Sequence, residues 1–197
     1  KKMFAFILSN HKFIESYGYL NHVACIDLPH YHKHLMLSDA YFNVAPTVEE
    51  KKQIIKNSQN FAQSIGYKQL KVALLSSVNF PNRKIKSATE AEKIKLTFER
   101  IGNNELLVGG PLTFEYATNM ESVIKDNFKS EIAGDVDAIV VANKDVGDPL
   151  YKALTLFGQA RIASLIIGAK FPIVLNEISA SKQSKIDSLL LALKINS

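Results

Sequence analysis

Short apolar runs, rich in leucine and β-branched residues, alternate with amphipathic segments along most of the chain. The runs cover residues 22–27, 71–76, 105–108, 137–141, 163–168 and 171–175. Runs such as 137–141 lack polar alternation, so we expect helices to bury them on both faces. The alternation predicts an α/β fold with a parallel sheet. Ligands of such sheets bind beyond the carboxyl ends of the strands, which here directs attention to the loops at residues 109–112, 142–148 and 176–181.

Capping patterns predict where two of the helices begin and end. Thr47 and Glu50 form a capping box ahead of an amphipathic segment, and Gly66 is expected to end that helix. Residues 87–90 repeat the capping box, and the helix that follows should stop near Gly102.

Two later helices are predicted in the same way. Asp148 and Pro149 are expected to supply the N-cap and the first-turn proline of a helix over residues 150–157. Ser181 is expected to cap the last helix. The large apolar residues of that helix form one stripe, consisting of Ile186, Leu189, Leu190 and Leu193.

Composition excludes several classes of protein. An apolar content of 47% is enough for a substantial core, and a single cysteine excludes an internal disulfide framework. No apolar run approaches the roughly 20 residues that span a bilayer, so we expect a cytoplasmic protein with no membrane partner. The 24 basic residues exceed the 19 acidic ones modestly and are spread over helix faces. We therefore do not expect a nucleic-acid partner, although the surplus also suits an anionic small molecule.

Several local features have two readings. His30, His32 and His34 would share one face of an extended segment and could bind zinc, but nothing completes a ligand set of known spacing, so a polar edge or loop is favoured. Cys25 lies in an apolar run and is expected to be a buried, unreactive thiol. The glycines of residues 109–110 let the backbone approach an anion, yet they also suit an ordinary tight turn.

Three segments in order give the chain a family resemblance: "GPLTFEYA", "SEIAGDVDAIVVANKDVGDPLYKAL" and "ASLIIGAKFPIVL". Together they resemble the phosphate acetyl/butyryltransferases. Upstream, "HVACIDLPHYHKHLMLSDAYFNVAPTVEEKKQII" is similar to the butyryl-type members. The resemblance covers essentially the whole chain, whereas the N-terminal third of the family has no counterpart in it.

The resemblance implies a fold and a reaction. The expected fold is a three-layer α/β/α arrangement like that of isocitrate and isopropylmalate dehydrogenases, with two lobes and a cleft. Residues 1–35 and 165–197 would belong to the first lobe and residues 36–164 to the second. The implied reaction moves a short-chain acyl group between coenzyme A (CoA) and inorganic phosphate. CoA is then a substrate rather than a cofactor, no metal is required, and the protein is expected to be a homodimer.

The resemblance also implies which residues bind substrate. Gly110, Pro111 and Leu112 match the Gly-Pro-Leu turn of the family. Where the family has Glu-Ala-Gly-Asn, this chain has residues 145–148, of which Asp145, Gly147 and Asp148 are the expected contacts. Downstream, the expected contacts are Lys152, Glu177, Ser179 and Lys185.

One departure from the family concerns the chemistry directly. Glu177 and Ile178 replace a Ser-Arg pair that is thought to serve the thiolate and the anionic substrate. An ionised Glu cannot donate a hydrogen bond and Ile cannot hold an anion, so no catalytic residue is assigned. Ser179 or Ser181 could take over the position of the lost serine.

Three hypotheses about function follow. The first is an active phosphate acyltransferase. The alternative is an impaired paralogue or fragment that binds CoA or acyl phosphate without turnover. A dehydrogenase of related fold is disfavoured, because no Gly-x-Gly-x-x-Gly motif or cluster of metal-binding aspartates is present. If the N-terminal strands of the family are missing, an open sheet edge should also favour oligomerisation.

Overall fold

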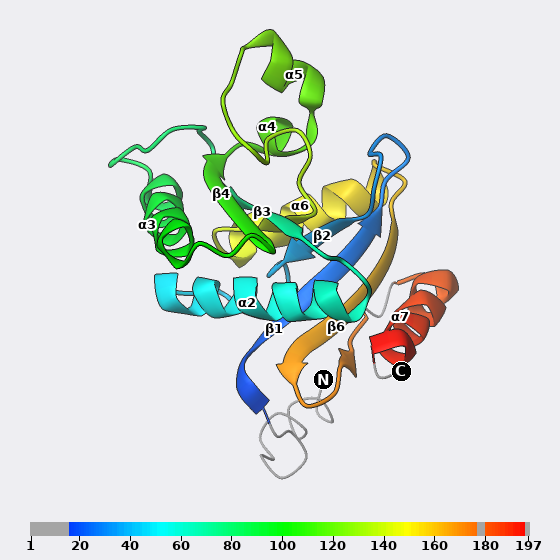
Figure 1. The fold of residues 1–197 in the computed structure, drawn as a ribbon. Coiled ribbons are helices and arrows are strands. Elements are labelled where there is room, and N and C mark those ends of the chain that lie inside the picture. Colours follow the sequence, from blue (N-terminus) through cyan, green and yellow to red (C-terminus); the bar gives the residue numbers. More distant parts are fainter. Residues whose placement is uncertain (1–15, 177–179, 196–197) are drawn as a thin grey trace.

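A computed structural model describes residues 16–176 and 180–195, and it contains one seven-stranded sheet (Figure 1). The order of the strands across the sheet is β4-β3-β5-β2-β1-β6-β7. The strands are β1 (Ser16–Asp27), β2 (Leu35–Ser38), β3 (Leu70–Leu75), β4 (Leu106–Leu112), β5 (Ala138–Val140), β6 (Arg161–Ala169) and β7 (Ile173–Val174). The six strands predicted from apolar runs are all present. The four-residue strand β2 was not predicted, because its apolar run is short.

The sheet is mixed, so the prediction of a parallel sheet is only partly right. β2, β5, β3 and β4 run parallel to one another, whereas β1 is antiparallel to both of its neighbours, β2 and β6. β7 is antiparallel to β6. Apolar runs do not encode direction, since a strand buried on both faces has the same composition in either orientation.

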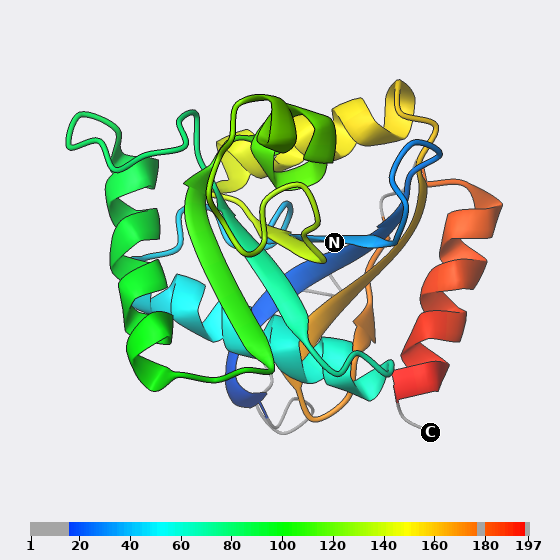
Figure 2. The ribbon, with the colours of Figure 1, turned by 45° about the horizontal axis from the view of Figure 1, so that its top comes forward.

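Helices cover both faces of the sheet (Figure 2). One core lies beneath α2 (Val48–Ser64) and α3 (Lys86–Ile101), and α7 (Lys182–Ile195) packs at its margin. The core on the other face includes α4 (Phe114–Thr118) and the inner side of α6 (Lys144–Leu156). The short helix α5 (Met120–Lys125) follows α4. Within the described ranges, no helix is long and apolar enough to cross a membrane.

The predicted limits of α2 are confirmed, and those of α3 are confirmed in part. Thr47 and Glu50 form the capping box of α2, and the helix ends just before Gly66. α3 does end at Gly102, which adopts a left-handed conformation. Its predicted capping box is wrong, because the helix already begins at Lys86. The Glu90 carboxylate binds the buried Lys51 ammonium at 2.5 Å instead, which ties α3 to α2.

Ser181 caps α7 as predicted, since its hydroxyl accepts the backbone N–H of Ser184 at 3.0 Å. The predicted apolar stripe of α7, however, points away from the sheet. Its four side chains are 39% to 68% exposed, whereas Ser188 is fully buried and its hydroxyl accepts the backbone N–H of Ser164. α7 therefore packs on the sheet through a face that contains a polar residue, and it leaves most of its large side chains outside.

Candidate functional site

The carboxyl ends of β2, β5, β3 and β4 lie along one edge of the sheet, because these four strands are parallel. The segments that follow them begin at Asp39, Val141, Ser76 and Thr113. Of the ten substrate-binding residues predicted from the sequence, four lie in the segment after β5 and three form the carboxyl end of β4 itself. This edge is the candidate functional site.

The N-terminus of α6 lies at this edge, earlier in the sequence than predicted. Asn143 caps the helix by accepting the backbone N–H of Val146 at 3.1 Å. The predicted cap, Asp148, is instead a residue of the helix, and Pro149 lies inside it. The correction has a local reason: Asn143 follows the end of β5 after only two residues, in an extended conformation, and can therefore cap the helix first. Asp145, Gly147, Asp148 and Lys152 are thus helical residues rather than loop residues.

Gly147 brings α6 close to the segment after β2. A Cβ at this position would lie 2.6 Å from the Cα of Ala40 and 3.2 Å from the carbonyl oxygen of Asp39. Because the nearest atoms belong to the protein backbone, the glycine serves helix packing here. The sequence predicts that Gly147 contacts substrate. The structure gives another reason for a glycine at this position, namely the close packing of α6 against the segment after β2.

Asp39 organises the segment after β2 and was not predicted from the sequence. Its side chain is 1% exposed and accepts four hydrogen bonds. The donors are the backbone N–H groups of His22, Tyr41 and Phe42 and the side-chain amide of Asn43, at 2.7 to 3.0 Å. The bonds to Tyr41 and Phe42 are local, so an aspartate at the start of a turn was the available sequence signal. The other bonds depend on β1 lying beside β2.

A buried histidine lies beside this segment. His22 of β1 is 3% exposed, and its ring lies 5.9 Å from that of Tyr41 and 6.2 Å from that of Tyr151 on α6. The ammonium of Lys144 lies 5.2 Å from the centre of the Tyr41 ring. The sequence indicates nothing special about His22, since β1, β2 and α6 meet only in the fold.

The Gly-Pro-Leu segment occupies a separate part of the edge. Gly110, Pro111 and Leu112 belong to β4 and not to a loop, because the strand continues past a register shift against β3. Gly110 has φ +137°, and an added Cβ would lie 2.8 Å from the carbonyl oxygen of Leu74. The three residues line a groove of about 620 Å³ beside β4. Two strands separate β4 from β2, so this groove and the N-terminus of α6 are distinct places.

The remaining predicted contacts are scattered. The Lys152 ammonium lies 5.9 Å from the centre of the Tyr151 ring on α6. Lys185 is exposed in the first turn of α7. Glu177 and Ser179 lie outside the described residues, so their roles stay predictions.

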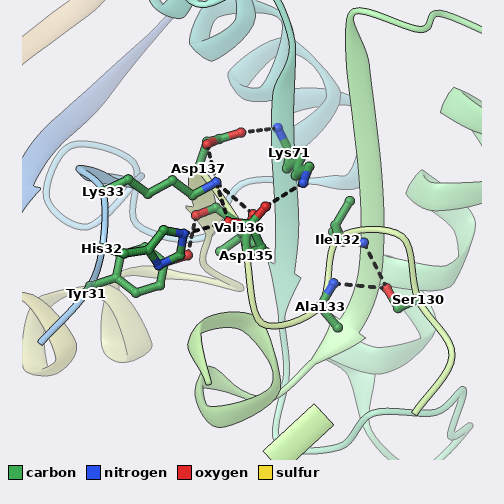
Figure 3. Close-up of polar contacts among 10 residues, drawn as sticks. All are labelled: Tyr31, His32, Lys33, Lys71, Ser130, Ile132, Ala133, Asp135, Val136 and Asp137. Carbon is green, nitrogen blue, oxygen red and sulfur yellow. Dashed lines mark hydrogen bonds and ion pairs between the residues drawn. The ribbon is translucent and has the colours of Figure 1, made fainter. Parts of the chain in front are cut away.

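An ion-pair network occupies the opposite edge, where strands begin (Figure 3). The Asp135 carboxylate contacts the Lys71 ammonium at 2.5 Å, His32 at 2.7 Å and the Lys33 ammonium at 2.9 Å. Lys33 also reaches Asp137 at 2.7 Å. Burial alone would raise the pKa of Asp135, but the hydrogen bonds from Lys71, Lys33 and His32 outweigh it and hold that pKa far below its usual range. Asp135 and Asp137 therefore connect neighbouring strands. These ion pairs are a sufficient structural reason for the two acidic residues, without a contact to substrate.

The histidines and the cysteine have ordinary surroundings. His30, His32 and His34 lie in the connection between β1 and β2 rather than in an extended strand. Among the residues that the structure describes, no group of three His, Cys, Asp or Glu side chains is placed to hold a metal ion. Cys25 is partly buried rather than fully buried as predicted. Burial nevertheless raises the pKa of its thiol to about 12, which supports the prediction of an unreactive residue.

The α6 end of the edge can bind an anion. The 13-residue helix α6 points its N-terminus toward the segment after β2, and the helix dipole makes that end positive. The backbone N–H of Lys144 donates to the carbonyl of Val44, and that of Val146 donates to Asn143, so the attraction for an anion comes mainly from the charge of this end. Lys144 adds a cation beside it, while Asp145 in the same turn opposes it. The arrangement suits a phosphate or another small anion that is attracted by the positive helix end and one ammonium group.

Comparison with known proteins decides the family. The family described as "Phosphate acetyl/butaryl transferase" matches residues 10–193. This chain belongs to that family.

Individual members of the phosphate acetyl/butaryl transferase family are similar over most of the chain. A probable phosphate butyryltransferase of Bacillus subtilis is 30% identical over 95% of this chain, and a phosphate acetyltransferase of Rhizobium meliloti is 32% identical over 88%. The crystal structure of a branched-chain phosphotransacylase from Enterococcus faecalis covers 98% of the chain with 36% identity and a TM-score of 0.91. The chain spans 62%, 55% and 69% of the lengths of these three proteins, respectively.

Proposed function

We propose that this protein transfers a short-chain acyl group between CoA and inorganic phosphate. The observation that carries the proposal is the positive N-terminus of α6, with Lys144 beside it, at the ligand-binding edge of a chain from the phosphate acyltransferase family. A phosphate oxygen attacks the thioester carbonyl carbon, a C–O bond forms and the C–S bond breaks. The products are acyl phosphate and CoA, whose thiolate takes up a proton.

The roles follow from the charges at this edge. The positive end of the α6 dipole and the Lys144 ammonium attract the phosphate dianion, and little reorganisation is needed because the helix end is already oriented. His22 and the two tyrosines around it wall the site beside Asp39. No residue is assigned to the thiolate, since the positions of the family's Ser-Arg pair, Glu177 and Ile178, lie outside the described residues.

The proposal includes the finer architecture that the resemblance implies. The proposed fold has three layers, like that of the dehydrogenases, and two lobes. Residues 1–35 and 165–197 belong to one lobe, and residues 36–164 belong to the other. Helices on both faces of the sheet support the layered part of this description. A homodimer in the cytoplasm, with CoA and phosphate as its small-molecule partners, completes it.

Thiol release from acetyl-, propionyl- and butyryl-CoA, measured with and without phosphate, tests the function. We expect release that requires phosphate. Lys144→Ala should raise the KM for phosphate about tenfold, as the loss of one charge-assisted hydrogen bond would. Lys125→Ala, on the exposed part of α5, is the matched control and should leave the KM unchanged.

The same assay separates the impaired alternative. CoA binding without phosphate-dependent release would favour a protein that binds without turnover. In that case the double variant Glu177→Ser, Ile178→Arg should gain activity. A double variant that binds CoA but stays inactive would show that the altered pair is not the cause.

A further inference from the structure

A partly buried tyrosine lies against the cation of the candidate site. The ammonium of Lys144 lies over the ring of Tyr41, 5.2 Å from its centre. A cation at this distance is attracted by the electron-rich face of an aromatic ring. The two residues are far apart in the sequence, and they meet because Gly147 lets α6 pack closely against the segment after β2. Lys144 therefore contacts a ring that its own helix does not supply.

The backbone that carries the Tyr41 ring is held by several hydrogen bonds. The N–H groups of Tyr41 and Phe42 donate to one oxygen of the Asp39 carboxylate, at 3.0 and 2.7 Å. The side-chain amide of Asn43 donates to the other oxygen at 2.7 Å and to the carbonyl of Leu20 on β1 at 2.9 Å. These bonds tie the segment to β1 and fix the point from which the ring projects.

The ring of Tyr41 also has a buried neighbour. It is tilted by 51° against the ring of His22, with 5.9 Å between the ring centres, and His22 is 3% exposed. His22 in turn contacts Tyr151 of α6, with 6.2 Å between the ring centres. Contacts to both His22 and Lys144 restrict the Tyr41 ring to one orientation.

The side chain of Lys144 needs such a support, although its backbone does not. Its backbone N–H donates to the carbonyl of Val44 at 2.9 Å. The flexible four-carbon stem would otherwise sample many conformations, including those that pair the ammonium with Asp148, four residues further along the same helix. Contact with the Tyr41 ring restricts this sampling. An ammonium that is already held near the helix end loses less conformational entropy when an anion binds.

We propose that Tyr41 is a positioning residue for Lys144. Its ring holds the ammonium at the positive end of α6, where that ammonium binds inorganic phosphate. This role rests on the proposed function, which supplies the phosphate. Tyr41 acts on the affinity for phosphate through Lys144, and its ring need not touch the anion.

Kinetics of thiol release, with phosphate and butyryl-CoA varied separately, test this role. Tyr41→Leu should raise the KM for phosphate by about two- to fivefold, which is the affinity equivalent of one cation–π contact near the surface. The kcat should stay close to that of the parent, because the contact is the same in the ground state and the transition state. Tyr41→Phe keeps the ring and should behave like the parent.

Tyr116→Leu is the matched control. Tyr116 is also a partly buried tyrosine, but it belongs to α4 and packs against the ring of Phe128, with 5.0 Å between the ring centres. This substitution should leave the KM for phosphate unchanged. Circular dichroism of each variant checks that it is folded. If Tyr41→Leu does not fold, Tyr41→Met removes the ring while keeping most of the apolar bulk, and the same rise in KM is expected.

A double-mutant cycle separates positioning from a purely structural effect. In the Lys144→Ala protein, a further Tyr41→Leu change should leave the KM for phosphate where Lys144→Ala alone puts it. An equal rise in both backgrounds would overturn the role, because it would not need the ammonium. A rise in the KM for butyryl-CoA instead of phosphate would also overturn it, since Lys144 would then bind a phosphate group of CoA.

Phosphate binding measured by calorimetry in the presence of CoA distinguishes this inference from the proposed function. Weaker phosphate binding by Tyr41→Leu, in a protein that releases no thiol, would support the positioning role and overturn acyl transfer. Phosphate-dependent release by the parent, with the same KM for phosphate in Tyr41→Leu, would overturn the positioning role alone. A parent that binds no phosphate would overturn both.

Discussion

An added Cβ at Gly147 would lie 2.6 Å from the Cα of Ala40 and 2.9 Å from Cγ2 of Val141. The absence of a side chain therefore sets the distance between α6 and the segment after β2. That segment is itself held by the four hydrogen bonds of Asp39. The position of the positive helix end next to His22 and Tyr41 depends on both residues.

Gly147→Ala should destabilise the protein although alanine is the better helix former. The alanine preference is worth about 1 kcal/mol, whereas overpacking against backbone costs about 1 to 3 kcal/mol. We expect a net loss in the free energy of unfolding, measured in urea. Asp145→Ala, an exposed position of the same helix, should change that free energy by less than about 0.5 kcal/mol. A Gly147→Ala protein as stable as the parent would contradict the close packing.

At the scale of elements, ion pairs and helix faces decide how neighbouring segments meet. Asp135 lies shortly before β5 and joins the starts of β2 and β3 through Lys33 and Lys71 (Figure 3). α7 packs on the sheet through Ser188, with its leucine stripe outside. In both cases the partner comes from a distant part of the chain. Helical periodicity identifies a stripe but does not say which face meets the sheet.

The Asp135 network should make stability depend on pH. The folded-state pKa of Asp135 is depressed, so its contribution is fully present above its unfolded pKa of about 3.9 and is lost as pH falls below that value. Asp135→Asn should therefore cost about 1 to 2 kcal/mol near neutral pH, a modest figure for a partly exposed network. The difference from the parent should shrink in acid. An equal difference at pH 7 and well below pH 4 would contradict this assignment.

At the scale of the whole molecule, the long strand β1 joins two parts of the chain. It pairs with β2 on one side and with β6 on the other, so residues from both predicted lobes share one sheet (Figure 1). The two-lobe division stays a prediction. A shared sheet favours one cooperative unit, since separating the parts would expose the backbone of β1.

We expect a single unfolding transition. Far-ultraviolet circular dichroism and tyrosine fluorescence should give the same midpoint in urea. Ile54→Ala, under α2, and Leu37→Ala, on the other face, each remove a fully buried side chain and should cost about 2 to 5 kcal/mol. Each substitution should shift both signals together. Two separate transitions, or a shift in only one signal, would show that the lobes unfold independently.

Local features explain which predictions were right. The α2 capping box, the glycine after α3 and the Ser181 cap depend on residues within a few positions of one another, so they could be predicted from the sequence. Ordered motifs also identified the family over residues 10–193. The predicted cap of α6 lies five residues after the observed one. Both Asp148-Pro149 and Asn143 are suitable residues for the start of a helix, and the position where β5 ends determines which of them is used.

The sequence by itself determined the α/β class, the family and most of the helices and strands, because these depend on periodicity, caps and motif order. Only the tertiary structure decided the direction of β1, the outward face of α7 and the separation of the Gly-Pro-Leu groove from the α6 end. The same holds for the group that the buried Asp39 and His22 form with the partly buried Tyr41 and Tyr151. The physical reason is that these features depend on contacts between segments far apart in the chain, and no local pattern specifies which segments become neighbours.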